Sequence, residues 1–261
     1  MVIGWLKERA VSLLEQHPYG YVLGLAIMES TSLLLPHESD FYGMPLLTSQ
    51  RSGLFLDVGA NRGHSSLGFK KVMPGWQTLA IEANPLHEPR LAALKRRHAF
   101  FDYRIAAADA VSGRSVTIWT PRYGGFDCHS AAALTREDAV RGILASFPDL
   151  EPNFRYEERL TRTLALDDLG IAPDIVKIDV QGKELDTIRG LEATIAKCRP
   201  SLLIECNLDD GTIASEMASL GYIAYIYERA NHSLTTAAAI ERPPSRNMFF
   251  LPKERAAGGR R

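Results

Sequence analysis

Leu54-Phe-Leu-Asp-Val-Gly-Ala-Asn-Arg-Gly-His64 is the stretch that decides the fold of this chain. Its apolar residues run up to Asp57, a pattern that predicts a buried parallel strand. Gly59 and Gly63 allow the backbone to turn sharply and leave no Cβ in the way of a ligand. A helix that begins after Gly63 would aim its first free N–H groups at the same point. We therefore expect a nucleotide-type cleft at the carboxyl end of this strand.

A second stretch, residues 174–185, repeats the pattern: Asp-Ile-Val-Lys-Ile-Asp-Val-Gln-Gly-Lys-Glu-Leu again leads from an apolar strand into an acidic residue, a glycine and a helix. Strands and helices alternate along most of the chain. Besides the strand ending at Asp57, we expect strands at 78–81, 103–107, 174–179, 201–205, 222–227 and 247–251, and helices at 64–72, 86–98, 183–197 and 212–220. This alternation predicts an α/β fold with a parallel sheet and right-handed crossovers.

A long insertion interrupts this alternation at about 121–159. Added strands are expected on either side of it, at 115–120 and 160–164, and a helical piece at 136–146. A loop of this length inside a compact domain is usually functional or mobile. The insertion is therefore the first candidate for contact with a substrate.

Residues 1–50 are expected to form a helical extension. An apolar stripe at helical spacing ends at Pro18, and a second apolar segment covers 19–35. The simplest interpretation is a plain extension that covers the core, and the alternatives are a lid or a contact between copies in a homo-oligomer. Residues 253–261 are expected to be a flexible tail.

The composition is that of an ordinary globular domain of 261 residues, with 30 basic and 31 acidic side chains, which gives no reason to expect nucleic acid as a partner. Three cysteines without a C-x-x-C pair fit a reducing compartment and argue against disulfides or a zinc site. The charged residues near the start break any secretory h-region, and the most apolar run, 19–28, is too short to span a bilayer. These features predict a cytoplasmic protein without a membrane span.

Three motifs in order, Asp57-Val-Gly-Ala-Asn-x-Gly63, Val176-Lys-Ile-Asp-Val-Gln-Gly182 and Pro200-Ser-Leu-Leu-Ile-Glu205, resemble the FkbM-type methyltransferase family. The resemblance covers roughly 54–207. It implies a Rossmann-like methyltransferase domain at 51–252, with a mostly parallel seven-stranded sheet whose last strand lies antiparallel between the fifth and the sixth. It also implies S-adenosylmethionine as the cofactor, and O-methylation of a hydroxyl on a small-molecule or saccharide acceptor, such as a sugar or a natural product.

The expected cofactor site combines the glycine turn with acidic strand ends. Glu82 ends the second strand, about 20 residues beyond the turn, where a carboxylate can accept both ribose hydroxyls of a bound nucleoside. Asp57 would hold the loop or meet the cofactor's ammonium, and Asn61 would contact the methionine carboxylate or cap the turn. Asp109 stands where this class of fold often contacts the adenine amino group, or it is a simple turn residue.

Asp179 is the first candidate for the catalytic base, because a carboxylate at the mouth of the cleft can orient or deprotonate an acceptor hydroxyl. Glu205 is the second candidate and His129, on the insertion, is the third. The family most often has glutamate where this chain has Gln181, which cannot take a proton. Asp179 with Glu205 could recruit Mg²⁺, but no dense carboxylate cluster is visible and we expect no metal.

Two rival interpretations stay open. A nicotinamide-dependent oxidoreductase also uses a glycine turn and a distant carboxylate, although the turn here, Gly-Ala-Asn-Arg-Gly, is not G-x-G-x-x-G. The other rival is a cofactor-binding module without catalysis, for which Gln181 is the hint.

Overall fold

The computed structural model describes residue 20 and the ranges 39–146, 148–206, 211–239 and 247–256. Most of the expected helical extension, residues 1–19 and 21–38, lies outside the described residues, as do the last five residues of the expected tail. The described end of this extension contains a 3₁₀ helix, η1 (Ser39–Leu47). The tail begins with a helical turn, α9 (Lys253–Ala256), in which Glu254 forms an ion pair with Arg199.

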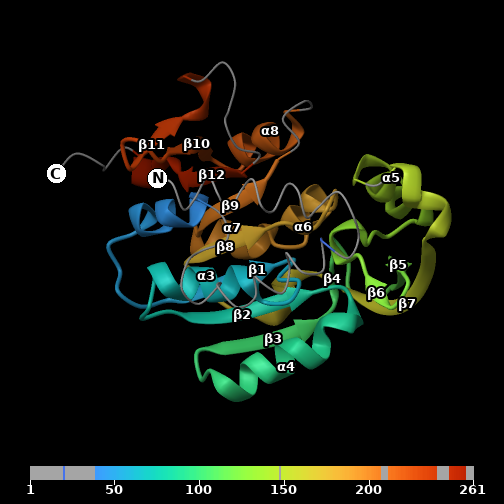
Figure 1. Ribbon diagram of the computed structural model, residues 1–261. Helices are drawn as coiled ribbons and strands as arrows, with labels where there is room; N and C mark the ends of the chain where they lie inside the picture. The colour runs from blue at the N-terminus through green and yellow to red at the C-terminus, as the bar shows by residue number, and fades with distance from the viewer. Residues whose placement is uncertain (1–19, 21–38, 147, 207–210, 240–246, 257–261) are drawn as a thin grey trace.

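An eight-stranded sheet forms the centre of the molecule (Figure 1). Its strands are β1 (Leu54–Val58), β2 (Gln77–Glu82), β3 (Phe101–Ile105), β8 (Ile175–Ile178), β9 (Ser201–Glu205), β10 (Tyr222–Glu228), β11 (Ser233–Thr236) and β12 (Asn247–Pro252). Their order is β11-β10-β12-β9-β8-β1-β2-β3. The five strands from β9 to β3 are parallel, and β12 lies antiparallel between β9 and β10, as predicted. The α/β fold is confirmed, but the count of seven strands missed β11, which pairs with β10 at the edge.

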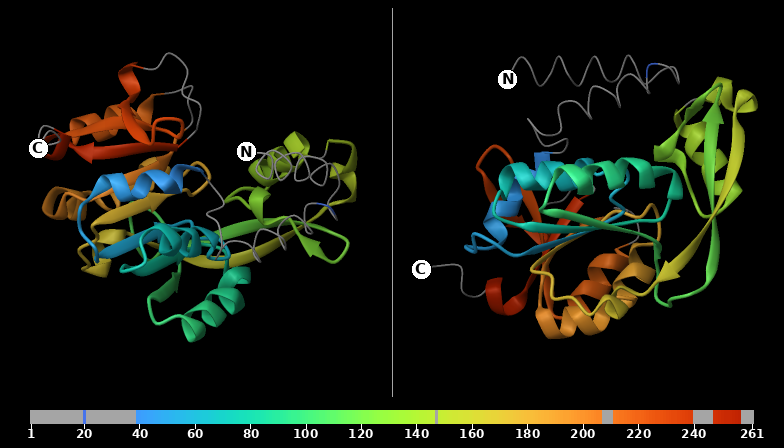
Figure 2. Two further views of the ribbon diagram at one scale, coloured as in Figure 1. Left: turned by 60° about the vertical axis from the view of Figure 1, so that its left-hand side comes forward. Right: turned by 90° about the horizontal axis from the view of Figure 1, so that it is seen from below.

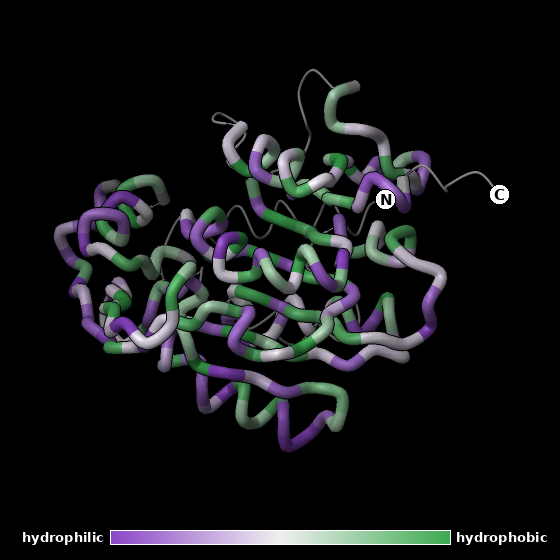
Figure 3. The backbone as a smooth tube through the Cα atoms, turned by 180° about the vertical axis from the view of Figure 1, so that it is seen from behind, coloured by the Kyte–Doolittle hydropathy of each residue, from purple (hydrophilic) through white to green (hydrophobic). Residues whose placement is uncertain are grey.

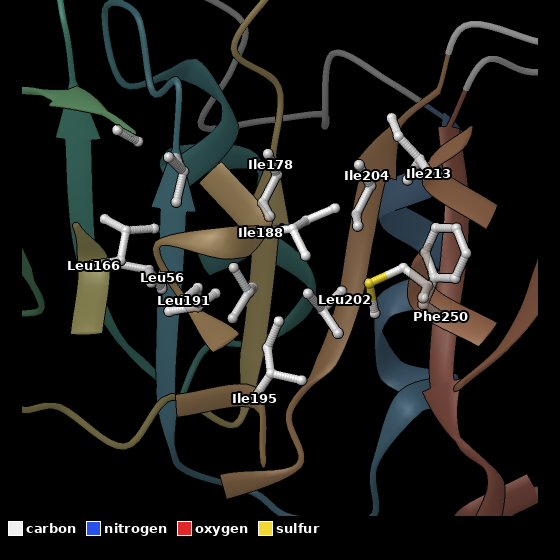
Figure 4. Close-up of a cluster of buried hydrophobic side chains, with 14 of the residues drawn as sticks. Leu56, Leu166, Ile178, Ile188, Leu191, Ile195, Leu202, Ile204, Ile213 and Phe250 are labelled. Carbon is white, nitrogen blue, oxygen red and sulfur yellow. The ribbon is translucent and has the colours of Figure 1, made fainter. Parts of the chain in front are cut away.

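Helices cover both faces of this sheet. On one face, η1, α3 (His64–Val72) and α4 (Glu88–Arg97) pack over the strands. On the other face lie α6 (Glu184–Arg189), α7 (Glu192–Cys198) and α8 (Thr212–Ser219). Figure 4 shows Ile188, Leu191 and Ile195 from the α6–α7 region against strand residues such as Leu56 and Leu202. Figure 3 shows the apolar residues concentrated along the central strands.

The insertion forms a separate small sheet of order β4-β7-β5-β6. Its long strands, β5 (Ser115–Tyr123) and β7 (Arg155–Leu164), pair antiparallel and are longer than predicted. The shorter elements are β4 (Ala107–Ala108), β6 (Phe126–Asp127), η3 (His129–Ala131), α5 (Arg136–Ser146) and η4 (Pro148–Asn153), of which α5 has the predicted bounds. Figure 2 shows this hairpin standing to one side of the main sheet.

Two predicted helices are interrupted. The helix expected at 86–98 begins as a 3₁₀ turn, η2 (Pro85–His87), before α4. The helix expected at 183–197 divides into α6 and α7 at Gly190. A Cβ on Gly190 would lie 2.1 Å from the carbonyl oxygen of Asp109. The backbones at Gly190 and Asp109 therefore lie closer together than a residue with a Cβ permits. A further 3₁₀ turn, η5 (Leu166–Leu169), joins β7 to β8.

None of the helices in the described part of the chain has the length and apolar character needed to cross a membrane.

Substitution of Gly59 by alanine is expected to destabilise the protein severely. Gly59 has a φ of +82°, and a Cβ there would lie 1.8 Å from the carbonyl oxygen of Asp179. Gly113 has a φ of +88° but no atom within 4 Å of its would-be Cβ, so Gly113→Ala measures the backbone strain alone. We expect about 1 kcal/mol for Gly113→Ala and roughly 2–4 kcal/mol for Gly59→Ala, measured by urea unfolding. Equal losses of unfolding free energy in the two variants would show that the backbone at Asp179 can move away from residue 59 at no cost, which would contradict this prediction.

Candidate functional site

Four carboxylates lie at the ends of four neighbouring strands. They belong to strands adjacent in the order β2-β1-β8-β9, and they are Glu82, Asp57, Asp179 and Glu205. All four belong to the sheet face covered by α3, because side chains alternate along a strand and the residues two or four positions earlier pack on that side. Those earlier residues are Phe55, Ala80, Ile175 and Leu203. The predicted acidic strand ends are therefore brought to one edge and one face.

Asp57 is fully buried behind the glycine turn. Its Oδ2 accepts hydrogen bonds from the Ser65 and Ser66 hydroxyls, each at 2.6 Å, which ties the end of β1 to the first turn of α3. Its Oδ1 has no hydrogen-bond partner. Burial raises the pKa of Asp57, although the Lys177 ammonium and the two serine hydroxyls act against this rise. Asp57 thus holds the loop, as one of its two predicted roles requires.

Glu82 joins the loop after β1 to the loop after β2. One carboxylate oxygen accepts the backbone N–H of Asn61 and the other accepts that of Asn84, each at 2.7 Å. Asn61 has a φ of +51°, so it is a turn residue in the left-handed region. Burial raises the pKa of Glu82 to about 7, against the effect of its two backbone hydrogen bonds. The side chain expected to meet a ribose is therefore placed between the two loops that would surround it.

The glycine turn delivers the start of α3 to the same edge. Gly63 has a φ of +85° and directly precedes α3, as predicted. A Cβ on Gly63 would lie 2.4 Å from a methyl carbon of Leu94, because the start of α3 packs closely on α4. The first N–H groups of α3 have no side-chain cap from this position.

Asp179 and Glu205 form a tight polar cluster with two further side chains. Lys177 Nζ lies 2.8 Å from Asp179 Oδ2, and Gln181 Nε2 lies 3.0 Å from Asp179 Oδ1 and 3.2 Å from Glu205 Oε2. Burial would raise the pKa of Asp179, but the Lys177 ammonium and hydrogen bonds from Glu205, Lys177 and Gln181 outweigh it and lower the pKa. Burial and the neighbouring Asp179 raise the pKa of Glu205 to about 7.

Glu184 is a structural residue of this site that the sequence analysis missed. It is buried, and its Oε1 accepts the backbone N–H groups of Val180 at 3.2 Å and Gly182 at 3.1 Å. These bonds fix the turn in which Gln181 adopts a φ of +55°. A glutamate placed two residues after a glycine, at the start of a helix, is the sequence pattern that could have indicated it.

Asp109 lines a pocket of about 920 Å³ between the insertion and α6. Its carboxylate accepts the backbone N–H of Ala110 and forms an ion pair with Arg114. The pocket is also lined by residues of β5, of the start of α5 and of α6: Val111, Ser115, Val116, Thr117, Trp119, Leu134, Thr135, Arg136, Glu137, Lys183 and Asp186. The predicted adenine contact and the predicted acceptor-binding insertion therefore share one cavity.

His129 is packed against a second histidine that the sequence analysis missed. The ring centroids of His87 and His129 are 4.5 Å apart. Burial, together with His129, Arg62 and His64, lowers the pKa of His87 to about 3, so this imidazole is neutral. Next to this pair, Asn84 Nδ2 donates to Thr120 Oγ1 of β5 at 3.1 Å. The loop after β2 is thus attached to the insertion by a hydrogen bond and a ring contact.

No group of three or more His, Cys, Asp or Glu side chains among the described residues is arranged to hold a metal ion.

Comparison with known proteins identifies the chain's relatives. Residues 57–224 match the family described as Methyltransferase FkbM domain. No curated protein matches the sequence. The crystal structure of methyltransferase FkbM from Methylobacillus flagellatus KT is 16% identical with a TM-score of 0.50, over 84% of this chain and 47% of that one. The chain thus spans about half the length of that structure, and the similarity shows the fold alone.

A second solved structure, precorrin-6y C5,15-methyltransferase from Geobacter metallireducens GS-15, is also 16% identical. The alignment covers 83% of this chain and 88% of that structure, with a TM-score of 0.42, and no conclusion about this chain is based on it.

Substitution of Glu82 by glutamine is expected to change how stability depends on pH. Because the pKa of Glu82 rises from 4.5 to about 7 on folding, the folded protein binds the proton more tightly in this window. Stability should therefore fall as the pH rises from 4.5 to 7, by up to about 3 kcal/mol from this group. Glu82→Gln removes that loss.

The measurement is the difference in unfolding free energy between the two proteins at a series of pH values. His87 has a lowered pKa, so its contribution reduces stability as the pH falls below about 6.5. This contribution is the same in both proteins and cancels in the difference. Glu88→Gln, an exposed substitution on the neighbouring α4, should leave the pH dependence unchanged. A difference between wild type and Glu82→Gln that does not vary with pH would contradict a proton held at Glu82.

Proposed function

The chain belongs to the FkbM methyltransferase family, and on this basis we propose that it is an S-adenosylmethionine-dependent methyltransferase that methylates a hydroxyl of a small acceptor, a sugar or a natural product. The observation that carries the proposal is the gathering of four carboxylates at one edge of the sheet, beside a turn made by two glycines with positive φ.

The charge of this edge suits a cofactor that carries a sulfonium and an ammonium. Three of the four carboxyls, Asp57, Glu82 and Glu205, have raised pKa values, and burial is the largest cause for each. A cationic ligand favours their ionised forms and so recovers free energy that burial costs. The unpartnered Oδ1 of Asp57 supports the same conclusion, because a buried acceptor without a hydrogen bond is costly.

Each predicted residue has a place in holding this cofactor. Glu82 would accept the ribose hydroxyls, Asp57 would face the cationic end directly or through water, and the turn from Gly59 to Gly63 would let the cofactor approach the backbone. Asp109 would meet the adenine amino group at the edge of the 920 Å³ cavity. When bound, S-adenosylmethionine supplies a methyl carbon that its sulfonium has already activated.

The insertion supports binding of the body of the acceptor in the same cavity, and its reacting hydroxyl would lie beyond the cavity lining, at the ends of β8 and β9. Residues 134–137 of the insertion and Trp119 of β5 line it, with hydroxyl groups from Ser115, Thr117 and Thr135. Hydroxyls, charged groups and an aromatic surface are the contacts that a polar, hydroxylated acceptor needs. The chain's remaining task is to orient the acceptor hydroxyl and remove its proton, which typically adds 10²- to 10⁴-fold to the rate.

Cofactor binding is tested by isothermal titration calorimetry with S-adenosylmethionine and its demethylated product. We expect both to bind, and we expect S-adenosylmethionine to release protons near pH 6.5, since a cation lowers the raised pKa values of the carboxyls. Titration in two buffers of different ionisation enthalpy gives the number of protons. Glu82→Gln should weaken binding about tenfold, as the loss of a charge-assisted hydrogen bond does, and Glu88→Gln should not.

Absence of heat with either compound would overturn the proposal, and binding of a nicotinamide cofactor instead would favour an oxidoreductase. Release of the demethylated product with a panel of hydroxylated acceptors then tests transfer itself. A module without catalysis would bind the cofactor normally and turn over none of these acceptors.

A further inference from the structure

One amide group joins the two carboxyls at the ends of β8 and β9. Gln181 Nε2 donates to Asp179 at 3.0 Å and to Glu205 at 3.2 Å, so both carboxyls lie within reach of a single NH₂ group. Two carboxylates held this close to one donor repel each other when both are ionised, so a proton on one of them is favoured. The two carboxyls of the pair therefore lose their protons at different pH values.

The position of that proton follows from the other contacts. Asp179 receives the ammonium of Lys177 at 2.8 Å in addition to the amide, and the Lys177 side chain is only 3% exposed. An ionised carboxylate gains most from a buried ammonium, so Asp179 is the ionised member. Glu205 has no such partner among its described contacts, and the negative Asp179 beside it favours its protonated form.

We propose that Glu205, rather than Asp179, takes the proton of the acceptor hydroxyl, and that Lys177 and Gln181 hold Asp179 as an ionised partner that makes Glu205 a stronger base. This inference rests on the proposed methyltransferase function. It reverses the order in which the sequence ranked the two carboxyls.

The transfer balances with no further reactant. The O–H bond of the acceptor breaks, its proton goes to a carboxylate oxygen of Glu205, and the oxygen electron pair forms the new bond to the methyl carbon. The electron pair of the broken methyl–sulfur bond stays on sulfur. Glu205 begins the step ionised, as it is above pH 7, and returns its proton to water after the products leave, so both carboxyls end ionised as they began.

Gln181 is a positioning residue in this arrangement. Its side chain is exposed at the edge of the sheet, while its backbone is fixed by the turn that Glu184 holds. An amide can donate to both carboxyls without adding a third acid, whereas a glutamate would bring a further negative charge or proton. The chain's departure from the family pattern therefore fits a base at Glu205.

Several described residues surround Glu205. Across the sheet it faces Asp179 and Lys177 of the β8 end, and Glu184 of α6 adds a further negative charge. On the other side, Asn247 of β12 stands opposite Glu205 in the strand register and donates to Asp40 of η1 at 3.0 Å. The Lys177 ammonium acts to lower the pKa of Glu205, and it is bound to Asp179.

The proton is located by ¹³C NMR of the side-chain carboxyls in protein labelled at glutamate and aspartate, titrated from pH 5 to 9. The signal that Glu205→Gln removes should titrate near 7, and the signal that Asp179→Asn removes should stay ionised throughout. In Asp179→Asn, the Glu205 signal should move toward its ordinary midpoint of 4.5. Gln181→Glu should move it upward. This readout needs neither cofactor nor acceptor.

Activity with an acceptor from the panel gives the second readout. Glu205→Gln should lower kcat by about 10²- to 10⁴-fold, and the matched exposed substitution Glu192→Gln on α7 should not change it. Wild-type kcat/KM should fall tenfold for each pH unit below about 7, and Asp179→Asn should move this midpoint to lower pH.

The inference is overturned if Glu205 titrates at its ordinary value, or if Glu205→Gln keeps wild-type kcat while Asp179→Asn loses it. Calorimetry with S-adenosylmethionine separates this failure from failure of the proposed function. A wild-type protein that binds no cofactor refutes the function. A Glu205→Gln variant that binds cofactor and keeps its kcat refutes only the assignment of the base.

Discussion

The ammonium of Lys177 is the charge on which the carboxyl edge of the sheet depends. It is almost fully buried, it forms an ion pair with Asp179, and it stands beside Asp57 in the register of β1 and β8. Buried carboxylates without a nearby cation are too costly to stay ionised, so they must either share that cation or keep a proton. Burial is the largest cause of the raised pKa values of Asp57, Glu82 and Glu205, and the Lys177 ammonium opposes it for Asp57 and Glu205 without cancelling it.

These raised pKa values connect the fold to the proposed chemistry. A sheet edge that holds protons on buried acids suits a ligand that brings its own cation, because binding then replaces protons with a fixed positive charge. It also leaves a carboxyl whose pKa is close to neutral, which is where a general base works best. The proposed cofactor recognition and proton removal would therefore depend on one arrangement of side chains.

Much of this arrangement is present in the sequence because strands alternate. The acidic residues at 57, 82, 179 and 205 each end an apolar run, and the period of two places them on one face once the strand order is known. The bounds of α3, α5 and β9 also agree with the local pattern. These features depend on neighbours in sequence, and so they could be predicted.

What the sequence did not show depends on contacts between distant segments. The break at Gly190 exists because the backbone of Asp109 passes against it, and neither residue indicates the other. The pairing of His87 with His129 joins segments some 40 residues apart, and the edge strand β11 is short and weakly apolar. The protonation of Glu205 was equally hidden, because it follows from a bridging amide and from the ammonium held by its neighbour.

Asn84 connects the end of β2 to the β5–β7 hairpin. Its backbone N–H donates to the carboxylate of Glu82, and its side-chain Oδ1 accepts the backbone N–H of Leu86 at the start of η2. Its side-chain Nδ2 donates to Thr120 on the hairpin. A shift of the hairpin would therefore reach Glu82, the residue proposed to meet the ribose. Thermodynamic coupling of this kind is reciprocal, so whatever free energy one ligand gains from the other's presence, the other gains in equal measure. If the cofactor meets Glu82 and the acceptor meets the hairpin, as proposed, Asn84 would make the occupancy of the two sites cooperative.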